Sequence, residues 1–184
     1  MEMAKSSRGK GQKMNEKEHA QKAALYGILI ALAMVMSFVE TLIPLPMPVP
    51  GMKLGLANLV TITGLWLVGI PGTVFVTILR VVLVGFSFGN PYSMIYGLSG
   101  AFFSLLAMAA AKRFHWFSQV GISILGGVFH NIGQLLFASF VVQTAGVFAY
   151  LPLLLAAGSV AGAVIGILGG ILTERLRKFI KNLN

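Results

Sequence analysis

Long apolar stretches, separated by short polar or proline- and glycine-containing segments, occupy most of this chain of 184 residues. A membrane-spanning helix needs about 20 consecutive, mostly apolar residues. Six stretches reach or approach this length, and we expect each to form a transmembrane helix: residues 23–43, 54–69, 71–88, 92–111, 117–142 and 149–172. The pattern predicts an all-α integral membrane protein whose six-helix transmembrane domain, residues 23–173, lies between basic tails at 1–22 and 174–184.

The second and third predicted spans are short, and only Gly69-Ile70-Pro71-Gly72 separates them. Glycine and proline at this spacing indicate a turn. The main alternative joins the two stretches into one span. Five spans would place the chain ends on opposite sides of the membrane, whereas six place both ends on the same side.

Charge and composition support the membrane assignment and the count of six. Only 10% of the residues are charged, whereas a soluble domain has about a quarter. Twelve of the 14 basic residues lie in the two tails and in the Lys112–Arg113 loop, which six spans place together. Basic residues favour the cytoplasmic side of a membrane. We therefore expect both termini in the cytoplasm, and we do not interpret the net charge of +9 as a nucleic-acid-binding signal.

Arg80 lies in the middle of the third predicted span. A charge at the bilayer centre costs about 2.5–3.5 kcal/mol on insertion scales, so it faces protein, water or a ligand. One interpretation is that the guanidinium binds an anion, because its planar fork matches carboxylate or phosphate. The alternative is an internal pair with Glu40 or with backbone carbonyls.

Further polar residues lie at a similar depth in the fifth predicted span: His130, Asn131 and Gln134. His130 and Gln134 are four residues apart and share one helix face. With Asn58 near the outer end of the second span, these groups gather in the outer half of the membrane. This distribution predicts a cavity that is open to the outside and closed towards the cytoplasm. The proline-rich segment Pro44–Pro50 is either a lid over that cavity or an ordinary surface loop.

Two stripes of small residues recur at four-residue spacing, which lets transmembrane helices approach closely. We expect the stripe on the last span to pack inside the protein: Gly158, Gly162, Gly166 and Gly170. For the stripe on the first span, internal packing and the docking of a partner subunit are both open: Ala23, Gly27 and Ala31.

Several motifs together resemble one family: Pro50-Gly51-Met52-Lys53-Leu54-Gly55-Leu56-Ala57-Asn58-Leu59-Val60-Thr61, Leu79-Arg80-Val81, Phe88-Gly89-Asn90-Pro91 and His130-Asn131-Ile132-Gly133-Gln134-Leu135. Over about residues 24–172 the chain resembles the membrane proteins called heptaprenyl diphosphate synthase component I, or the Gx transporter family. That family resembles the substrate-binding S components of energy-coupling factor (ECF) transporters. The resemblance implies six helices and an outward-facing pocket formed by Lys53, Asn58, Arg80, Asn90, His130, Asn131 and Gln134. It also implies that Ala23, Gly27 and Ala31 dock a transmembrane coupling subunit, which works with ATPases.

The synthase name does not fit this chain as an enzyme. Prenyl elongation needs Mg²⁺ held by clustered carboxylates, because a diphosphate leaving group requires a hard cation with oxygen ligands. The chain contains no Asp, and its five Glu are dispersed. It also lacks a glycine-rich nucleotide-binding loop with lysine. We expect no catalytic activity, no metal and no cofactor.

The sequence leaves two functional hypotheses. The first is an S component in a bacterial cell membrane that captures a small anionic or amphipathic metabolite from outside. The family label alone suggests an isoprenoid or quinone precursor. The second is a non-catalytic membrane accessory subunit for a prenyl diphosphate synthase.

Overall fold

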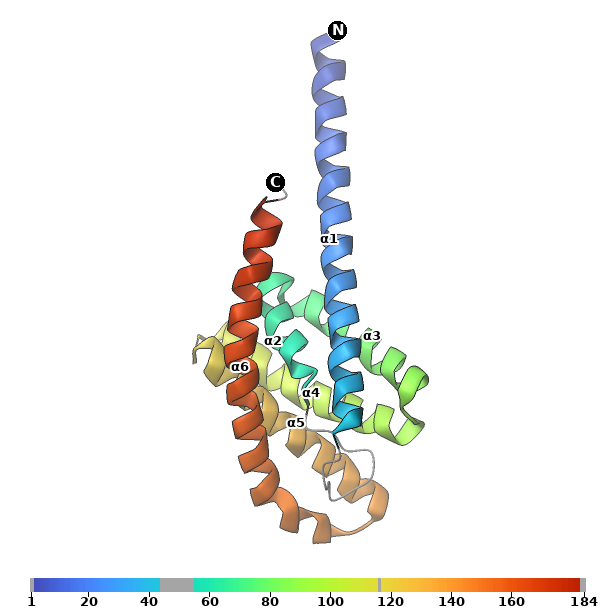
Figure 1. Ribbon diagram of the computed structural model, residues 1–184, viewed down its shortest axis with the longest axis vertical. Helices are drawn as coiled ribbons and strands as arrows, with labels where there is room; N and C mark the ends of the chain where they lie inside the picture. The colour runs from blue at the N-terminus through green and yellow to red at the C-terminus, as the bar shows by residue number, and fades with distance from the viewer. Residues whose placement is uncertain (1, 44–54, 116, 183–184) are drawn as a thin grey trace.

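A computed structural model describes residues 2–43, 55–115 and 117–182, and all regular structure within these ranges is helical (Figure 1). The elements in chain order are α1 (Glu2–Leu42), α2 (Asn58–Leu67), α3 (Gly69–Phe88), α4 (Pro91–Arg113), α5 (Gln119–Val142), the 3-10 helix η1 (Ala145–Tyr150) and α6 (Leu151–Asn182). Among the described residues, five segments are long and apolar enough to cross a membrane: His19–Leu42, Gly69–Phe88, Pro91–Arg113, Gln119–Val142 and Ala145–Lys181. The predicted all-α, multi-pass membrane class is confirmed.

The predicted span over residues 54–69 is not confirmed, because its described residues form only the short helix α2. This helix has 10 residues, and at 1.5 Å per residue it reaches only about half of the ~30 Å hydrocarbon core. One continuous span over both stretches is not seen either, because α2 and α3 are separate helices. Gly69 has a φ of +75°, a left-handed conformation that glycine adopts without steric cost. Within the described ranges the chain therefore forms five long α-helices and one short one.

The helices extend beyond the predicted transmembrane domain at both ends. The helix α1 begins at Glu2 and α6 continues to Asn182, so neither predicted tail boundary is a helix end. The tails are rich in Lys, Glu and Gln, which have good helix propensity, and extending an existing helix costs less than nucleating a new one. Figure 1 shows the N-terminal part of α1 and the C-terminal part of α6 extending from the same end of the bundle. We call this the tail end.

Glycines on α5 bring it close to both of its neighbours. A Cβ atom at Gly158 would lie 2.8 Å from the Gly127 carbonyl oxygen on α5, and one at Gly133 would lie 2.7 Å from the Ser99 oxygen on α4. Both distances are below van der Waals contact. Gly162 and Gly166 also pack against α5, as the predicted internal role requires, whereas a Cβ atom at Gly170 would meet nothing within 4 Å.

An apolar cluster fixes the position of α1 against the short helix and α3. It contains Leu29, Ala33, Val60 and Val76, all buried. This packing places the last turns of α1 beside the middle of α3, where Arg80 lies.

Candidate functional site

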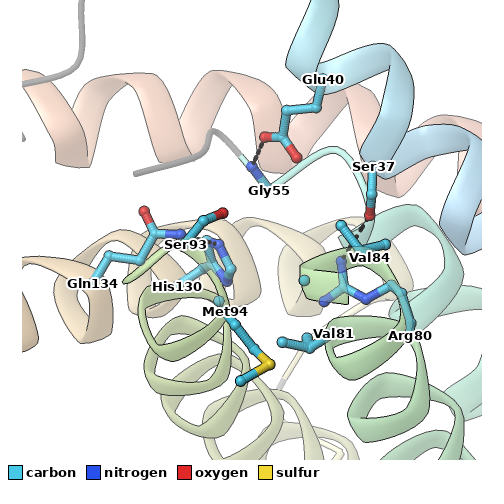
Figure 2. Close-up of a pocket in the computed structure, with 12 residues that line it drawn as sticks. Ser37, Glu40, Gly55, Arg80, Val81, Val84, Ser93, Met94, His130 and Gln134 are labelled. Atoms are coloured by element: carbon cyan, nitrogen blue, oxygen red, sulfur yellow. Dashed lines mark hydrogen bonds between the residues drawn. The ribbon is translucent and has the colours of Figure 1, made fainter. Parts of the chain in front are cut away.

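A small polar cavity lies at the end of the bundle opposite the tail end, between α1, α3, α4 and α5 (Figure 2). Its volume is about 30 Å³, which is room for about two water molecules. Its lining combines polar groups with glycines and apolar side chains: Ser37, Glu40, Gly55, Arg80, Val81, Val84, Gly85, Ser93, Met94, Gly97, His130 and Gln134.

Arg80 comes from the middle of α3 and is only 7% exposed. Its Nη1 donates to the hydroxyl of Ser37 on α1 over a long 3.5 Å. Its Nε has no hydrogen-bond partner among the described residues. A buried donor left without a partner costs about 1–3 kcal/mol, and more when the group is charged. The cavity therefore holds a cation whose hydrogen-bonding capacity is incompletely used.

Glu40 lies one turn after Ser37 on α1 and lines the same cavity. Its carboxylate accepts hydrogen bonds from the backbone N–H groups of Gly55 and Leu56. It thereby joins the end of α1 to the turn that precedes α2. Glu40 is also near enough to act electrostatically on Arg80. The two charges of the alternative Arg80–Glu40 pair are therefore close to each other. The hydrogen bonds of the Glu40 carboxylate described above, however, come from backbone N–H groups.

His130 and Gln134 form a pair on the face of α5 that lines the cavity, opposite Arg80 in Figure 2. The amide nitrogen of Gln134 lies 2.8 Å from His130 Nε2. With the amide as donor, Nε2 is the acceptor and a neutral ring carries its proton on Nδ1.

Two glycines leave the space that the imidazole of His130 fills. A Cβ atom at Gly55 would lie 3.0 Å from the ring, and one at Gly100 would lie 2.7 Å from it. Gly55 also has a φ of +92°, which L side chains rarely adopt. The orientation of His130 therefore depends on glycine at both positions.

The cavity excludes Asn131, although it is adjacent to His130 in sequence. Its Nδ2 donates to the Leu154 carbonyl on α6 over 2.8 Å.

The buried Asn58 begins α2, and its Nδ2 has no partner among the described residues but lies near Gly55. Asn90 is exposed and caps α4 by accepting from the Ser93 N–H over 2.8 Å. Lys53 and the Pro44–Pro50 segment lie outside the described residues.

Sequence reasoning did not assign Ser37, Gly55 or Ser93 to the site. One signal was present: Ser37 and Glu40 are three residues apart, so they share a face near the end of an otherwise apolar helix. Gly55 and Ser93 carried no comparable signal, because their place in the lining depends on how the loops pack.

The cavity gathers hydrogen-bonding groups around Arg80: Ser37, Ser93, the His130–Gln134 pair and the Glu40 carboxylate. Charge-assisted hydrogen bonds from arginine to carboxylate or phosphate are about twice as strong as neutral ones. Among the described residues, no group of three His, Cys, Asp or Glu side chains is placed to hold a metal ion. The Arg80 Nε–H, which has no partner among the described residues, is the donor in this lining that an anionic group could use.

The small-residue stripe of α1 lies outside the packed interior. Ala23, Gly27 and Ala31 are all exposed, and a Cβ atom at Gly27 would meet nothing within 4 Å. Internal packing therefore does not occupy this face in the described part of the chain.

A family model described as heptaprenyl diphosphate synthase component I matches residues 29–172, which include all the described residues that line the cavity. No curated protein and no solved structure matches the chain. The matched range begins within the apolar part of α1, includes α2 to α5, and ends within α6. The chain is a multi-pass membrane protein that belongs to the heptaprenyl diphosphate synthase component I family.

Proposed function

We propose that this protein is the substrate-binding S component of an ECF-type uptake transporter and captures a small anionic or amphipathic metabolite. The observation that carries the proposal is the guanidinium of Arg80, which is buried in a polar cavity and has an Nε–H without a hydrogen-bond partner among the described residues. An anionic group of the substrate would accept from this donor. His130, Gln134 and Ser93 would then orient the rest of the molecule.

The size of the cavity gives the binding step a further requirement. Its volume of about 30 Å³ is far below the ~300–1,000 Å³ of typical small-molecule sites. Substrate binding must therefore separate the cavity walls. At the end of α1, Ser37 reaches Arg80 only over 3.5 Å, whereas Glu40 is hydrogen-bonded to the Gly55 and Leu56 backbone.

The exposed stripe on α1 supports the transport proposal independently. Small residues every four positions allow two membrane helices to approach closely, and no described part of this chain covers Ala23, Gly27 or Ala31. In our proposal this face docks a transmembrane coupling subunit, and partner ATPases supply the energy. The membrane would be a bacterial cell membrane, with the tail end in the cytoplasm.

The substitution Gly27→Leu is expected to separate docking from folding. It adds a side chain where no neighbour lies within 4 Å of the Cβ position, so the melting temperature of the isolated protein should stay within about 2 °C, as for most surface changes. Co-purification of the coupling subunit and ATPases from the native membrane should fall at least tenfold. Val160→Leu, an exposed apolar change on α6, is the matched control. Unchanged co-purification with Gly27→Leu would contradict the docking role.

The capture function is tested by native mass spectrometry of the protein extracted from its own membrane. We expect the wild type to carry a small molecule that Arg80→Ala and His130→Ala do not retain. Thr77→Val is the control, because Thr77 is buried on the same helix but does not line the cavity. Wild-type protein that carries no small molecule, or equal retention in all four proteins, would count against substrate capture.

The description of the family favours a second candidate, a non-catalytic membrane accessory subunit of a prenyl diphosphate synthase. The chain would then position lipid-like substrate for a soluble partner. Co-purification of a prenyl synthase in place of ATPases, with no bound small molecule, would select this function.

A further inference from the structure

The hairpin of α3 and α4 is tightly packed at one end only. Near the polar cavity, a Cβ atom at Gly85 would lie 3.0 Å from Met94, and one at Gly97 would lie 3.3 Å from Val81. Further towards the tail end, no glycine in the described length of α3 and α4 brings the two helices this close. Large side chains face each other there. The two helices enclose an apolar groove there, lined by Ile70, Val74, Thr77, Ile78, Leu98, Ala101, Phe102, Leu105, Leu106 and Ala109.

The groove has the size and surface of a site for one hydrocarbon chain. Its volume is about 500 Å³, roughly three times that of a ~150 Å³ apolar cavity that binds benzene. A transmembrane helix is about 10–12 Å wide with its side chains, so it would rest across the rim rather than fill the groove. Thr77 is the single polar residue of the lining, and this leaves little to recognise a polar ligand inside it.

A positive charge lies just beyond the tail end of this groove. Arg113 ends α4 four residues after Ala109, so the two share a helix face. Arg113 is exposed and makes no hydrogen bond or ion pair with another described residue. The neighbouring Lys112 contacts α2 instead. Its Nζ donates to the Leu65 carbonyl and lies 4.8 Å from the centre of the Trp66 ring.

We infer that the α3–α4 groove is a binding site for an anionic phospholipid. One acyl chain lies between Val74 and Leu105, and Arg113 binds the phosphate. Basic groups at the ends of clefts between membrane helices commonly hold lipid head groups. This site is separate from the Arg80 cavity, which lies towards the opposite end of α3, and it does not depend on the transport proposal.

The test uses the full chain in lipid nanodiscs that contain equal amounts of phosphatidylglycerol and phosphatidylcholine with identical acyl chains. After transfer to detergent, native mass spectrometry counts the lipids that remain bound. Wild type should retain phosphatidylglycerol preferentially, and Arg113→Gln should lower this preference roughly fivefold, as expected for one basic residue near a lipid surface. Arg175→Gln, an exposed change on α6, is the charge control and should leave the preference unchanged.

A second variant tests the hydrocarbon part of the site. Ala109→Trp fills the tail end of the groove and should reduce retention of both lipids, whereas Val160→Trp on the exposed face of α6 should not. The proposal is overturned if Arg113→Gln keeps the wild-type preference or if Arg175→Gln lowers it equally. It is also overturned if Ala109→Trp disrupts a dimer without changing lipid retention, since a second copy would then occupy the groove. If Ala109→Trp does not fold, the lipid preference of Arg113→Gln alone decides whether the proposal stands.

Discussion

Replacing Arg80 by methionine is expected to stabilise the ligand-free protein while abolishing its retention of an anionic ligand. Arg80 is 7% exposed, and its Nε has no hydrogen-bond partner among the described residues. Replacing buried ionic groups by packed apolar ones often stabilises a protein by about 1–4 kcal/mol when no buried charge is left uncompensated. Glu40, the anion near Arg80, would keep its hydrogen bonds to the Gly55 and Leu56 N–H groups in this variant. Methionine keeps the unbranched stem and has a similar helix propensity. The free energy of unfolding should therefore rise.

The binding effect should be the larger of the two. Removing one partner of a buried ion pair costs about 3–5 kcal/mol, because the other charge stays buried without compensation. This corresponds to a loss of affinity of roughly 100-fold or more. Retention is measured by native mass spectrometry, and stability by the unfolding of protein from which the ligand has been removed.

The sign of the stability change separates a binding role from an internal pair. Thr77→Val on the same helix is the control for changes in buried polarity, and it should leave retention unaffected. If Arg80→Met lowers the free energy of unfolding by about 1 kcal/mol or more in the ligand-free protein, a typical destabilising effect, the guanidinium stabilises the fold. The internal pair with Glu40 would then be the better interpretation.

Substituting Gly127 by alanine is expected to destabilise the bundle more than the same change at any exposed glycine. The added Cβ atom would collide with the backbone carbonyl of Gly158, so α5 and α6 would have to separate. Overpacking of this kind costs about 1–3 kcal/mol even where side chains can adjust, and backbone atoms adjust less. We expect a loss at the upper end of that range, and no folded protein for Gly127→Leu.

Gly170→Ala is the matched control. Gly170 belongs to the same glycine repeat of α6 as Gly158, and among the described residues it has no neighbour within 4 Å of the Cβ position. Its free energy of unfolding should equal that of the wild type or exceed it by up to about 1 kcal/mol, because alanine has the higher helix propensity. Reversible unfolding in mixed micelles measures both variants. Equal effects at Gly127 and Gly170 would show that the close α5–α6 approach is absent in the membrane.

The spacing of polar residues on α5 explains which of them line the cavity. His130 and Gln134 share a helix face by their spacing, and both line the cavity. Depth in the membrane groups Asn131 with them, but depth does not fix the direction of a side chain. Consecutive helical residues differ in direction by about 100°, and Asn131 accordingly turns towards α6. Helix geometry could have separated it from the pair in advance.

The sequence by itself determined the membrane class, the long helices and the burial of Arg80, because apolar length and the cost of an intramembrane charge are properties of single segments. Only the tertiary structure decided that α2 is short, that Glu40 binds the Gly55 backbone and that the cavity is as small as about 30 Å³. These features arise where segments distant in the sequence meet. Their geometry depends on close contacts between glycines and side chains, which no periodicity within one helix encodes.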